Sequence, residues 1–161
     1  MELKGIVDED FINYKLPSMF LITSHCDWKC CLEAGIDTSV CQNYPLFKEK
    51  SKIINDEDIF ERYINNPITK SIVIGGLEPF LQFKELFDLI FYFRTCKNCN
   101  DTFIIYTGYY PEEIQGQIQF LKGFKNIIIK FGRYIPNQSN KYDEVLGITL
   151  ASNNQFAKQI S

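Results

Sequence analysis

The alternation of short apolar runs with helical segments is the feature that most restricts the fold. Helix-capping residues and helical spacing predict helices over about 57–65 and 81–94, and Pro111 suits the first turn of another. Strands that alternate with such helices favour a mainly parallel sheet covered by helices. We therefore expect an α/β fold, and, with no internal repeat or linker, a single domain over residues 1–161. The apolar runs that predict strands are 18–23, 72–74, 102–106, 126–131 and 145–150.

Three loops that follow predicted strands are expected to meet at one edge of this sheet. They are the cysteine-rich segment 24–41, the turn at Gly75 and Gly76, and the turn at Thr107 and Gly108. Right-handed crossovers place such loops at the carboxyl ends of parallel strands, where open α/β sheets bind their ligands. The sequence therefore predicts one shared site.

The segment 24–41 groups four of the six cysteines within sixteen residues. Thiolates grouped in this way select iron–sulfur clusters, zinc or copper(I), and local turns bring their sulfurs together without a long loop closure. We interpret the group as a metal or cluster site; zinc bound with the help of His25 and metal-free buried thiols are the alternatives. Cys96 and Cys99, an isolated pair, are interpreted as ordinary thiols. The grouped cysteines are Cys26, Cys30, Cys31 and Cys41.

Cys26 and Cys30 are the first two ligands that we expect. The third is Cys41 or Cys31. Neighbouring cysteines point in divergent directions, which makes joint ligation by Cys30 and Cys31 awkward, whereas Cys41 returns on a ten-residue loop. We therefore favour Cys41. A cluster held by three cysteines would leave one iron open to a substrate or cofactor.

The composition argues against several other classes of function. The 17 Lys and Arg and 20 Asp and Glu give a formal net charge of −3, and no basic stripe is present, so nucleic-acid binding has no electrostatic support. No apolar run reaches transmembrane length, and the N-terminus lacks the apolar core of a signal peptide. We therefore expect a cytoplasmic protein without membrane contact, in a reducing compartment. Neither a hydrolytic triad nor a phosphate-binding loop is present.

The spacing Cys26-x3-Cys30 after the first predicted strand is accompanied by four further motifs along the chain. These are Asp-Phe-Ile-Asn at 10–13, Gly-Gly-Leu-Glu-Pro at 75–79, Tyr-Thr-Gly-Tyr at 106–109 and Leu-Ala-Ser-Asn-Asn-Gln at 150–155. In order and spacing the set resembles the radical SAM superfamily, in particular the activating proteins of anaerobic ribonucleoside-triphosphate reductases. The usual pattern there is Cys-x3-Cys-x2-Cys, and this chain has Glu33 where the third cysteine would fall. That departure leaves the third ligand open and suggests a divergent branch that binds a 4Fe-4S cluster.

The resemblance implies a fold, cofactors and partners. The fold would be an incomplete open parallel (βα) barrel, and the cofactors would be a 4Fe-4S cluster and S-adenosylmethionine. Such oxidoreductases cleave S-adenosylmethionine to methionine and a 5′-deoxyadenosyl radical, which takes a hydrogen atom from a glycine of a partner enzyme. The partners would be a glycyl-radical enzyme, such as an anaerobic ribonucleotide reductase, and an electron donor such as flavodoxin or ferredoxin. The alternative is a non-catalytic iron–sulfur or zinc-binding interaction module.

Seven residues are candidates for contact with the cofactor. The glycine turn suits a close backbone approach, although a simple tight turn is the alternative. The single tryptophan would shield the cluster or stack on adenine, or else pack in the core. Lys130 and Arg133 flank the end of the fourth predicted strand and suit a carboxylate, although such side chains are more often solvated. The seven candidates are Trp28, Gly75, Gly76, Glu78, Tyr106, Ser152 and Asn153.

Overall fold

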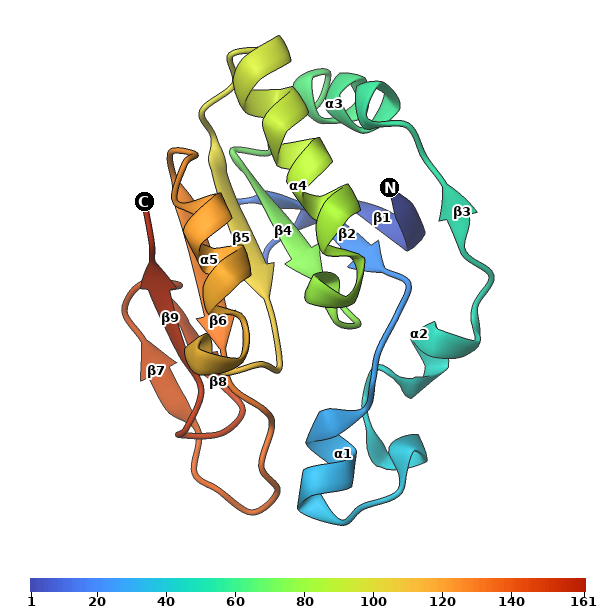
Figure 1. The fold of residues 1–161 in the computed structure, drawn as a ribbon, viewed down its shortest axis with the longest axis vertical. Helices are drawn as coiled ribbons and strands as arrows, with labels where there is room; N and C mark the ends of the chain where they lie inside the picture. Colours follow the sequence, from blue (N-terminus) through green and yellow to red (C-terminus); the bar gives the residue numbers. More distant parts are fainter.

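The computed structural model describes residues 1–161 and contains one large sheet, one small sheet and several short helices (Figure 1). The strands are β1 (Glu2–Asp10), β2 (Ser18–Thr23), β3 (Lys52–Ile53), β4 (Ser71–Gly75), β5 (Thr102–Tyr106), β6 (Ile127–Phe131), β7 (Lys141–Asp143), β8 (Ile148–Leu150) and β9 (Phe156–Gln159). The α-helices are α1 (Lys29–Ala34), α2 (Tyr44–Lys48), α3 (Asp56–Ile64), α4 (Phe83–Phe91) and α5 (Gln115–Leu121). Shorter turns of 3-10 or π-helix are η1 (Thr38–Val40), η2 (Pro79–Gln82), η3 (Tyr92–Cys96) and η4 (Pro111–Glu113).

The large sheet has parallel strands at its centre and antiparallel strands at its edges. Its order is β3-β1-β2-β4-β5-β6-β9. Strands β2, β4, β5 and β6 run parallel, whereas β1, β3 and β9 are antiparallel to their neighbours. The arrows of β4, β5 and β6 point toward the end of the molecule where α1 lies (Figure 1). The carboxyl ends of the parallel strands therefore face the cysteine-rich segment.

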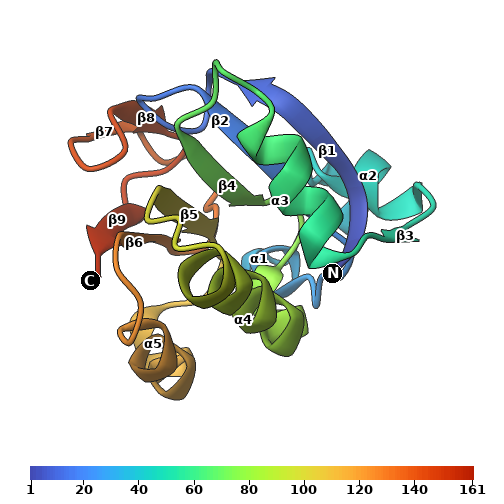
Figure 2. The ribbon, with the colours of Figure 1, turned by 90° about the horizontal axis from the view of Figure 1, so that it is seen from above.

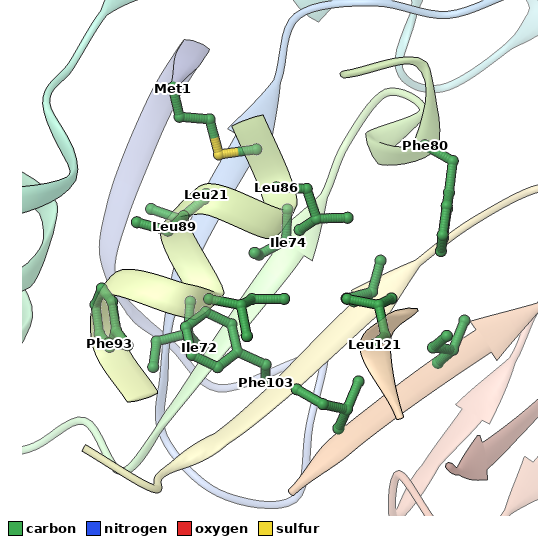
Figure 3. Close-up of a cluster of buried hydrophobic side chains, with 14 of the residues drawn as sticks. Met1, Leu21, Ile72, Ile74, Phe80, Leu86, Leu89, Phe93, Phe103 and Leu121 are labelled. Carbon is green, nitrogen blue, oxygen red and sulfur yellow. The ribbon is translucent and has the colours of Figure 1, made fainter. Parts of the chain in front are cut away.

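The main core lies between the sheet and the helices α3, α4 and α5. Side chains alternate along each strand, so that in β4 Ile72 and Ile74 face the helices while Val73 faces the opposite side. Figure 2 shows the three helices on the same side of the sheet. In Figure 3, Leu86 and Leu89 of α4 pack over Ile72 and Ile74. These interlocking apolar residues fix the strands whose ends position the site.

A smaller apolar cluster covers the other face of the sheet. There Val73, Ile104 and Ile128, one from each of the strands β4, β5 and β6, pack with Leu146 and Leu150. The antiparallel pair β7–β8 and the loop around it supply this cover (Figure 2). The three central strands are therefore buried on both faces, which explains their nearly continuous apolar sequences.

The structure confirms an α/β fold with a mostly parallel central sheet, and four of the predicted strands coincide with β2, β4, β5 and β6. The prediction of a last strand over 145–150 was wrong in part. Only Ile148–Leu150 is extended, it pairs with β7 in the separate small sheet, and the chain ends with β9 in the large sheet. Strand β1 was not predicted, because its charged sequence shows no apolar run.

The predicted helix over 81–94 is divided in the structure. It consists of η2, α4 and η3 in succession, and α4 proper begins at Phe83. The apolar spacing that predicted a helix is correct over α4, whose buried side chains are Leu86, Leu89 and Ile90. The helix predicted over 57–65 is confirmed as α3, with Asn55 at its N-cap position.

Candidate functional site

The carboxyl edge of the sheet brings together the three loops that follow β2, β4 and β5. The backbone N–H of Glu78 donates to the carbonyl oxygen of His25 at 2.7 Å. The N–H of Gly108 donates to the Glu78 carboxylate at 2.8 Å, and the N–H of Thr107 donates to the carbonyl of Lys130 at 2.9 Å. The cysteine-rich segment, the Gly75–Pro79 turn and the Thr107–Gly108 turn thus form one site, as the sequence predicts.

Glu78 links two of these loops from a buried position. Its side chain is only 6% exposed, and both carboxylate oxygens accept hydrogen bonds. Oε1 accepts from the hydroxyl of Thr107 at 2.7 Å and from the N–H of Phe80 at 3.1 Å, while Oε2 accepts from Gly108. Burial raises the pKa of Glu78 to about 7, although these hydrogen bonds oppose the shift. The carboxylate therefore joins the β4 and β5 turns.

Cys26 and Cys30 lie close together beside these turns. Trp28 is the N-cap residue of α1 and lies in the left-handed region at φ 61°. Its backbone N–H donates to Cys26 Sγ at 3.4 Å. Gly108 lies directly against Cys30, because a Cβ atom built on Gly108 would come within 3.0 Å of Cys30 Sγ. Burial raises the pKa of Cys26 to about 12, and the nearby charges of Glu78, Asp27 and Cys30 add to that shift.

Cys31 and Cys41 form a second pair of neighbouring thiols. Cys31 is 3% exposed and Cys41 is partly buried. Burial raises the pKa of Cys31, and the neighbouring Cys41 adds to that shift. Nowhere in the chain do three or more Cys, His, Asp or Glu side chains converge in a group that could hold a metal ion. The structure therefore presents the four cysteines as two pairs.

A carboxylate takes the helical position where the resemblance expects a third cysteine. Cys30 and Glu33 are three residues apart on α1, which places them on the same face of the helix. Both line a cavity of about 200 Å³, together with Tyr110, Tyr134 and Arg133. Oε2 of Glu33 lies 2.9 Å from Nε of Arg133. The third position is thus occupied by a carboxylate that is already paired.

Arg133 connects the loop after β6 to two other segments. Its side chain is 4% exposed, and its Nη atoms donate to Glu113 at 2.6 and 2.7 Å. The guanidinium lowers the pKa of Glu113 to about 2, with Lys29 as a further donor. Since Arg133 also contacts Glu33, it joins α1, η4 and the end of β6 around the cavity.

Lys130 places a second cation near the site, inside β6. It is 7% exposed, and its ammonium donates to the carbonyl oxygen of Gly132 at 3.0 Å. Burial lowers the pKa of Lys130 to about 8, whereas the charges of Cys30 and Glu78 oppose that shift. The expectation that Lys130 and Arg133 are solvated was wrong, because both side chains lie inside the protein.

The glycine turn is packed against the protein's own side chains. A Cβ atom on Gly75 would come within 2.9 Å of Cβ of Tyr106, and one on Gly76 within 2.7 Å of Cγ2 of Ile22. Gly76 also has φ +85°, a conformation that suits glycine. Tyr106 faces the smaller apolar cluster, and its hydroxyl donates to the carbonyl of Asn13. The strands therefore approach closely here, and the cofactor contacts predicted for these residues stay predictions.

The other predicted site residues are distributed around the edge of the sheet. The ring of Trp28 packs on Phe47 and Tyr44 of α2, at centroid distances of 5.2 and 5.9 Å. Ser152 is fully buried, and its hydroxyl accepts from the N–H of Ile135 at 3.4 Å. Asn153 is exposed and its amide donates to Ser139, also at 3.4 Å.

His25 is not part of a metal-binding group. Its ring is half exposed and lies 3.3 Å from the carboxylate of Glu2. The two remaining thiols, Cys96 and Cys99, follow α4 at the far end of the sheet.

Sequence reasoning missed several residues that build this edge. Asp27 accepts from the hydroxyl of Tyr109 at 2.7 Å, and Glu113 pairs with Arg133. Lys130 carried a usable signal, because it is the single charged residue in the apolar run Ile127–Phe131. No local pattern identified Asp27 or Glu113, since their partners lie far away in the sequence.

Two observations indicate that the residues at this edge suit a sulfur-ligated cluster. Cys26 and Cys30, four residues apart at the start of α1, both lie at the carboxyl edge, and Gly108, which has no side chain, leaves room for the sulfur of Cys30. Cys31 directly follows Cys30 on α1, and Cys41 lies at the end of η1, the next helical turn of the chain. Soft thiolates are the ligands that iron–sulfur clusters require.

Comparisons with known proteins agree with this chemistry. The model of a protein family described as "4Fe-4S single cluster domain" matches residues 18–156, which include β2, the cysteine-rich segment and all the turns of the site. No curated protein and no solved structure gave a significant match. None of the helices combines the length and apolar character needed to cross a membrane. The matched range covers most of the chain, and the chain therefore belongs to the 4Fe-4S single cluster domain family.

Proposed function

We propose that this chain uses its 4Fe-4S cluster to bind and reductively cleave S-adenosylmethionine, and so activates a glycyl-radical enzyme such as an anaerobic ribonucleotide reductase. The observation that carries the proposal is the meeting of Cys26 and Cys30 with the Gly75–Pro79 and Thr107–Gly108 turns at one edge. On this proposal β2, β4, β5 and β6 form the incomplete open barrel of a radical SAM protein, with the site at its carboxyl end.

We assign Cys26, Cys30 and Cys41 as the cluster ligands. Cys41 is partly exposed, whereas Cys31 is 3% exposed and would have to leave its buried position. Cys41 follows the short η1 turn, and its ligation would require the loop after α1 to move. When bound, the cluster supplies the electron that cleaves S-adenosylmethionine to methionine and a 5′-deoxyadenosyl radical, and flavodoxin or ferredoxin restores that electron.

On this proposal the chain's own residues bind and orient the ligand and shield it from water. Glu78 holds the β4 and β5 turns at a fixed separation, so that their backbone groups face the ligand site. Arg133 fixes α1 and η4 around the cavity next to Cys30. Tyr110 and Tyr134, which also line that cavity, are large enough to exclude water from a bound ligand. A closed, dry site prevents loss of a reactive radical to solvent.

Anaerobic reconstitution with iron and sulfide tests the proposal. We expect about four irons per chain, an electron paramagnetic resonance signal of the reduced cluster that changes on addition of S-adenosylmethionine, and 5′-deoxyadenosine in the product analysis. A cluster that forms but neither responds to S-adenosylmethionine nor yields 5′-deoxyadenosine would identify a non-catalytic iron–sulfur module. Glu33, at the third ligand position of the radical SAM pattern, is the observation that favours this second function.

Four single cysteine-to-alanine variants assign the ligands. Cys26→Ala and Cys30→Ala should each lose the cluster, as should Cys41→Ala, whereas Cys31→Ala should keep its iron. Cys96→Ala is the matched control, because Cys96 is exposed and lies at the opposite end of the sheet. Full iron content in Cys41→Ala together with its loss in Cys31→Ala would reverse the assignment of the third ligand.

A further inference from the structure

Lys130 is a buried cation that the proposed chemistry does not use. It belongs to β6, where every residue from Ile127 to Phe131 is buried, and its own side chain is 7% exposed. Lysine is almost never buried without a partner for its charge. An ammonium in this position therefore needs a physical explanation.

The protein gives the Lys130 ammonium few partners of its own. Of its three N–H donors, one reaches the carbonyl oxygen of Gly132 at 3.0 Å. No carboxylate lies within ion-pairing distance of Nζ, in contrast to Arg133, which pairs with Glu33 and Glu113. The carboxylate of Glu78 is near enough to influence Lys130, but both its oxygens are held by the β4 and β5 turns. The positive charge is thus left without a direct counterion.

The uncompensated charge lies on the Cys30 side of the site. The N–H of Thr107 donates to the carbonyl oxygen of Lys130 at 2.9 Å, and the next residue, Gly108, lies against Cys30, because a Cβ atom built on it would come within 3.0 Å of Cys30 Sγ. The charges of Lys130 and Cys30 also influence each other. The region is dry, because Lys130, Glu78 and Arg133 are all less than 8% exposed. Charges interact more strongly in such surroundings than in water, since the effective dielectric constant is lower.

We propose that Lys130 is a positioning residue that sets the reduction potential of the 4Fe-4S cluster by holding a positive charge against its Cys30 side. Reduction adds one electron, and so one negative charge, to a group already bound by thiolates. A neighbouring cation stabilises the reduced form more than the oxidised form and raises the potential, which in iron–sulfur proteins depends on net charge, hydrogen bonds and exposure. The inference rests on cluster binding alone and is independent of S-adenosylmethionine cleavage.

Redox titration of the reconstituted full-length chain tests this role. Lys130→Met removes the charge and keeps an unbranched apolar side chain, and Lys130→Gln removes the charge but keeps a donor for the carbonyl of Gly132. Both should lower the ratio of reduced to oxidised cluster by about tenfold at a fixed applied potential, which for a one-electron couple corresponds to about 59 mV. Lys122→Met, at an exposed lysine beyond α5, is the matched control and should leave the ratio unchanged.

The iron content of each variant, measured alongside the potential, separates the outcomes. A lower potential in both neutral variants, each with the iron content of the wild type, supports the role. An unchanged potential in a neutral variant that carries the full cluster overturns it, even if S-adenosylmethionine binds more weakly, because the cation would then serve that ligand. Absence of a cluster from the wild type would overturn both this inference and the proposed function. A wild type that binds the cluster but does not cleave S-adenosylmethionine, with the expected shift in potential in the variants, would overturn only the proposed function.

Discussion

Glu78→Gln should remove a pH dependence from the stability of the cluster-free protein. The Glu78 carboxyl is 6% exposed, and burial raises its pKa from 4.5 to about 7 in the folded chain. Because the folded state holds this proton more tightly than the unfolded state, Glu78 contributes most stability below pH 4.5. That contribution is lost as the pH rises through about 7. The wild type should therefore become less stable, relative to the variant, with increasing pH.

The size of this pH dependence of stability follows from the shift in the pKa of Glu78. One pKa unit corresponds to about 1.4 kcal/mol, so a shift from 4.5 to about 7 corresponds to about 3 kcal/mol in total. Most of it, about 2–3 kcal/mol, falls between about pH 5 and pH 8. At every pH the glutamine also loses one hydrogen bond, because its amide NH₂ group faces the N–H of Gly108 in place of an acceptor, at a cost of about 1–3 kcal/mol.

Urea unfolding at several pH values measures both contributions. The free energy of unfolding of the wild type minus that of Glu78→Gln should fall by about 2–3 kcal/mol between about pH 5 and pH 8. Subtracting the two free energies of unfolding cancels the contributions of groups that titrate alike in both proteins. Glu112→Gln, at an exposed glutamate in η4, should give a constant difference from the wild type. Parallel pH profiles for wild type and Glu78→Gln would refute the reasoning.

Two further substitutions test the packing of the site. Gly108→Ala should lower the iron content after reconstitution, because its Cβ would meet Cys30 Sγ at 3.0 Å. Gly116→Ala, at a position with open space around it, is the control and should bind iron normally. Equal iron content in the two variants would show that Cys30 tolerates the methyl group. Gly76→Ala should destabilise the fold by about 1–3 kcal/mol in urea unfolding, since φ is +85° and Ile22 lies 2.7 Å from the new Cβ; a change below about 0.5 kcal/mol would contradict the strain.

The parallel part of the fold was predictable from the sequence because each central strand is buried on both faces. Val73, Ile104 and Ile128 fill the side of the sheet away from the helices, so the strands read as uninterrupted apolar runs. Strands β1 and β9 lie outside this parallel core and have no such run. Strand β1 is charged at most of its exposed positions, and its place follows from antiparallel pairing with β2. Pairing of that kind depends on tertiary contacts and leaves no local pattern.

The candidate site was predictable in position and less so in detail. The convergence of the loops follows from the topology, and Cys26 with Cys30 follows from spacing. The division of the cysteines into two pairs depends on how α1 turns, which places Glu33 rather than Cys31 on the face of Cys30. The ion pairs of Arg133 join segments far apart in the chain. No pattern in a single segment could reveal them.

The pairing of Arg133 with Glu33 also bears on how iron would reach the site. The Glu33 side chain is 57% exposed, whereas the Arg133 side chain is 4% exposed, so the contact closes one side of the cavity next to Cys30 at the protein surface. Entry from this side requires α1 to separate from the end of β6, and therefore requires this contact to break. Salt weakens contacts between charges that solvent can reach. Iron uptake should consequently become faster as ionic strength rises, while the amount finally bound stays the same.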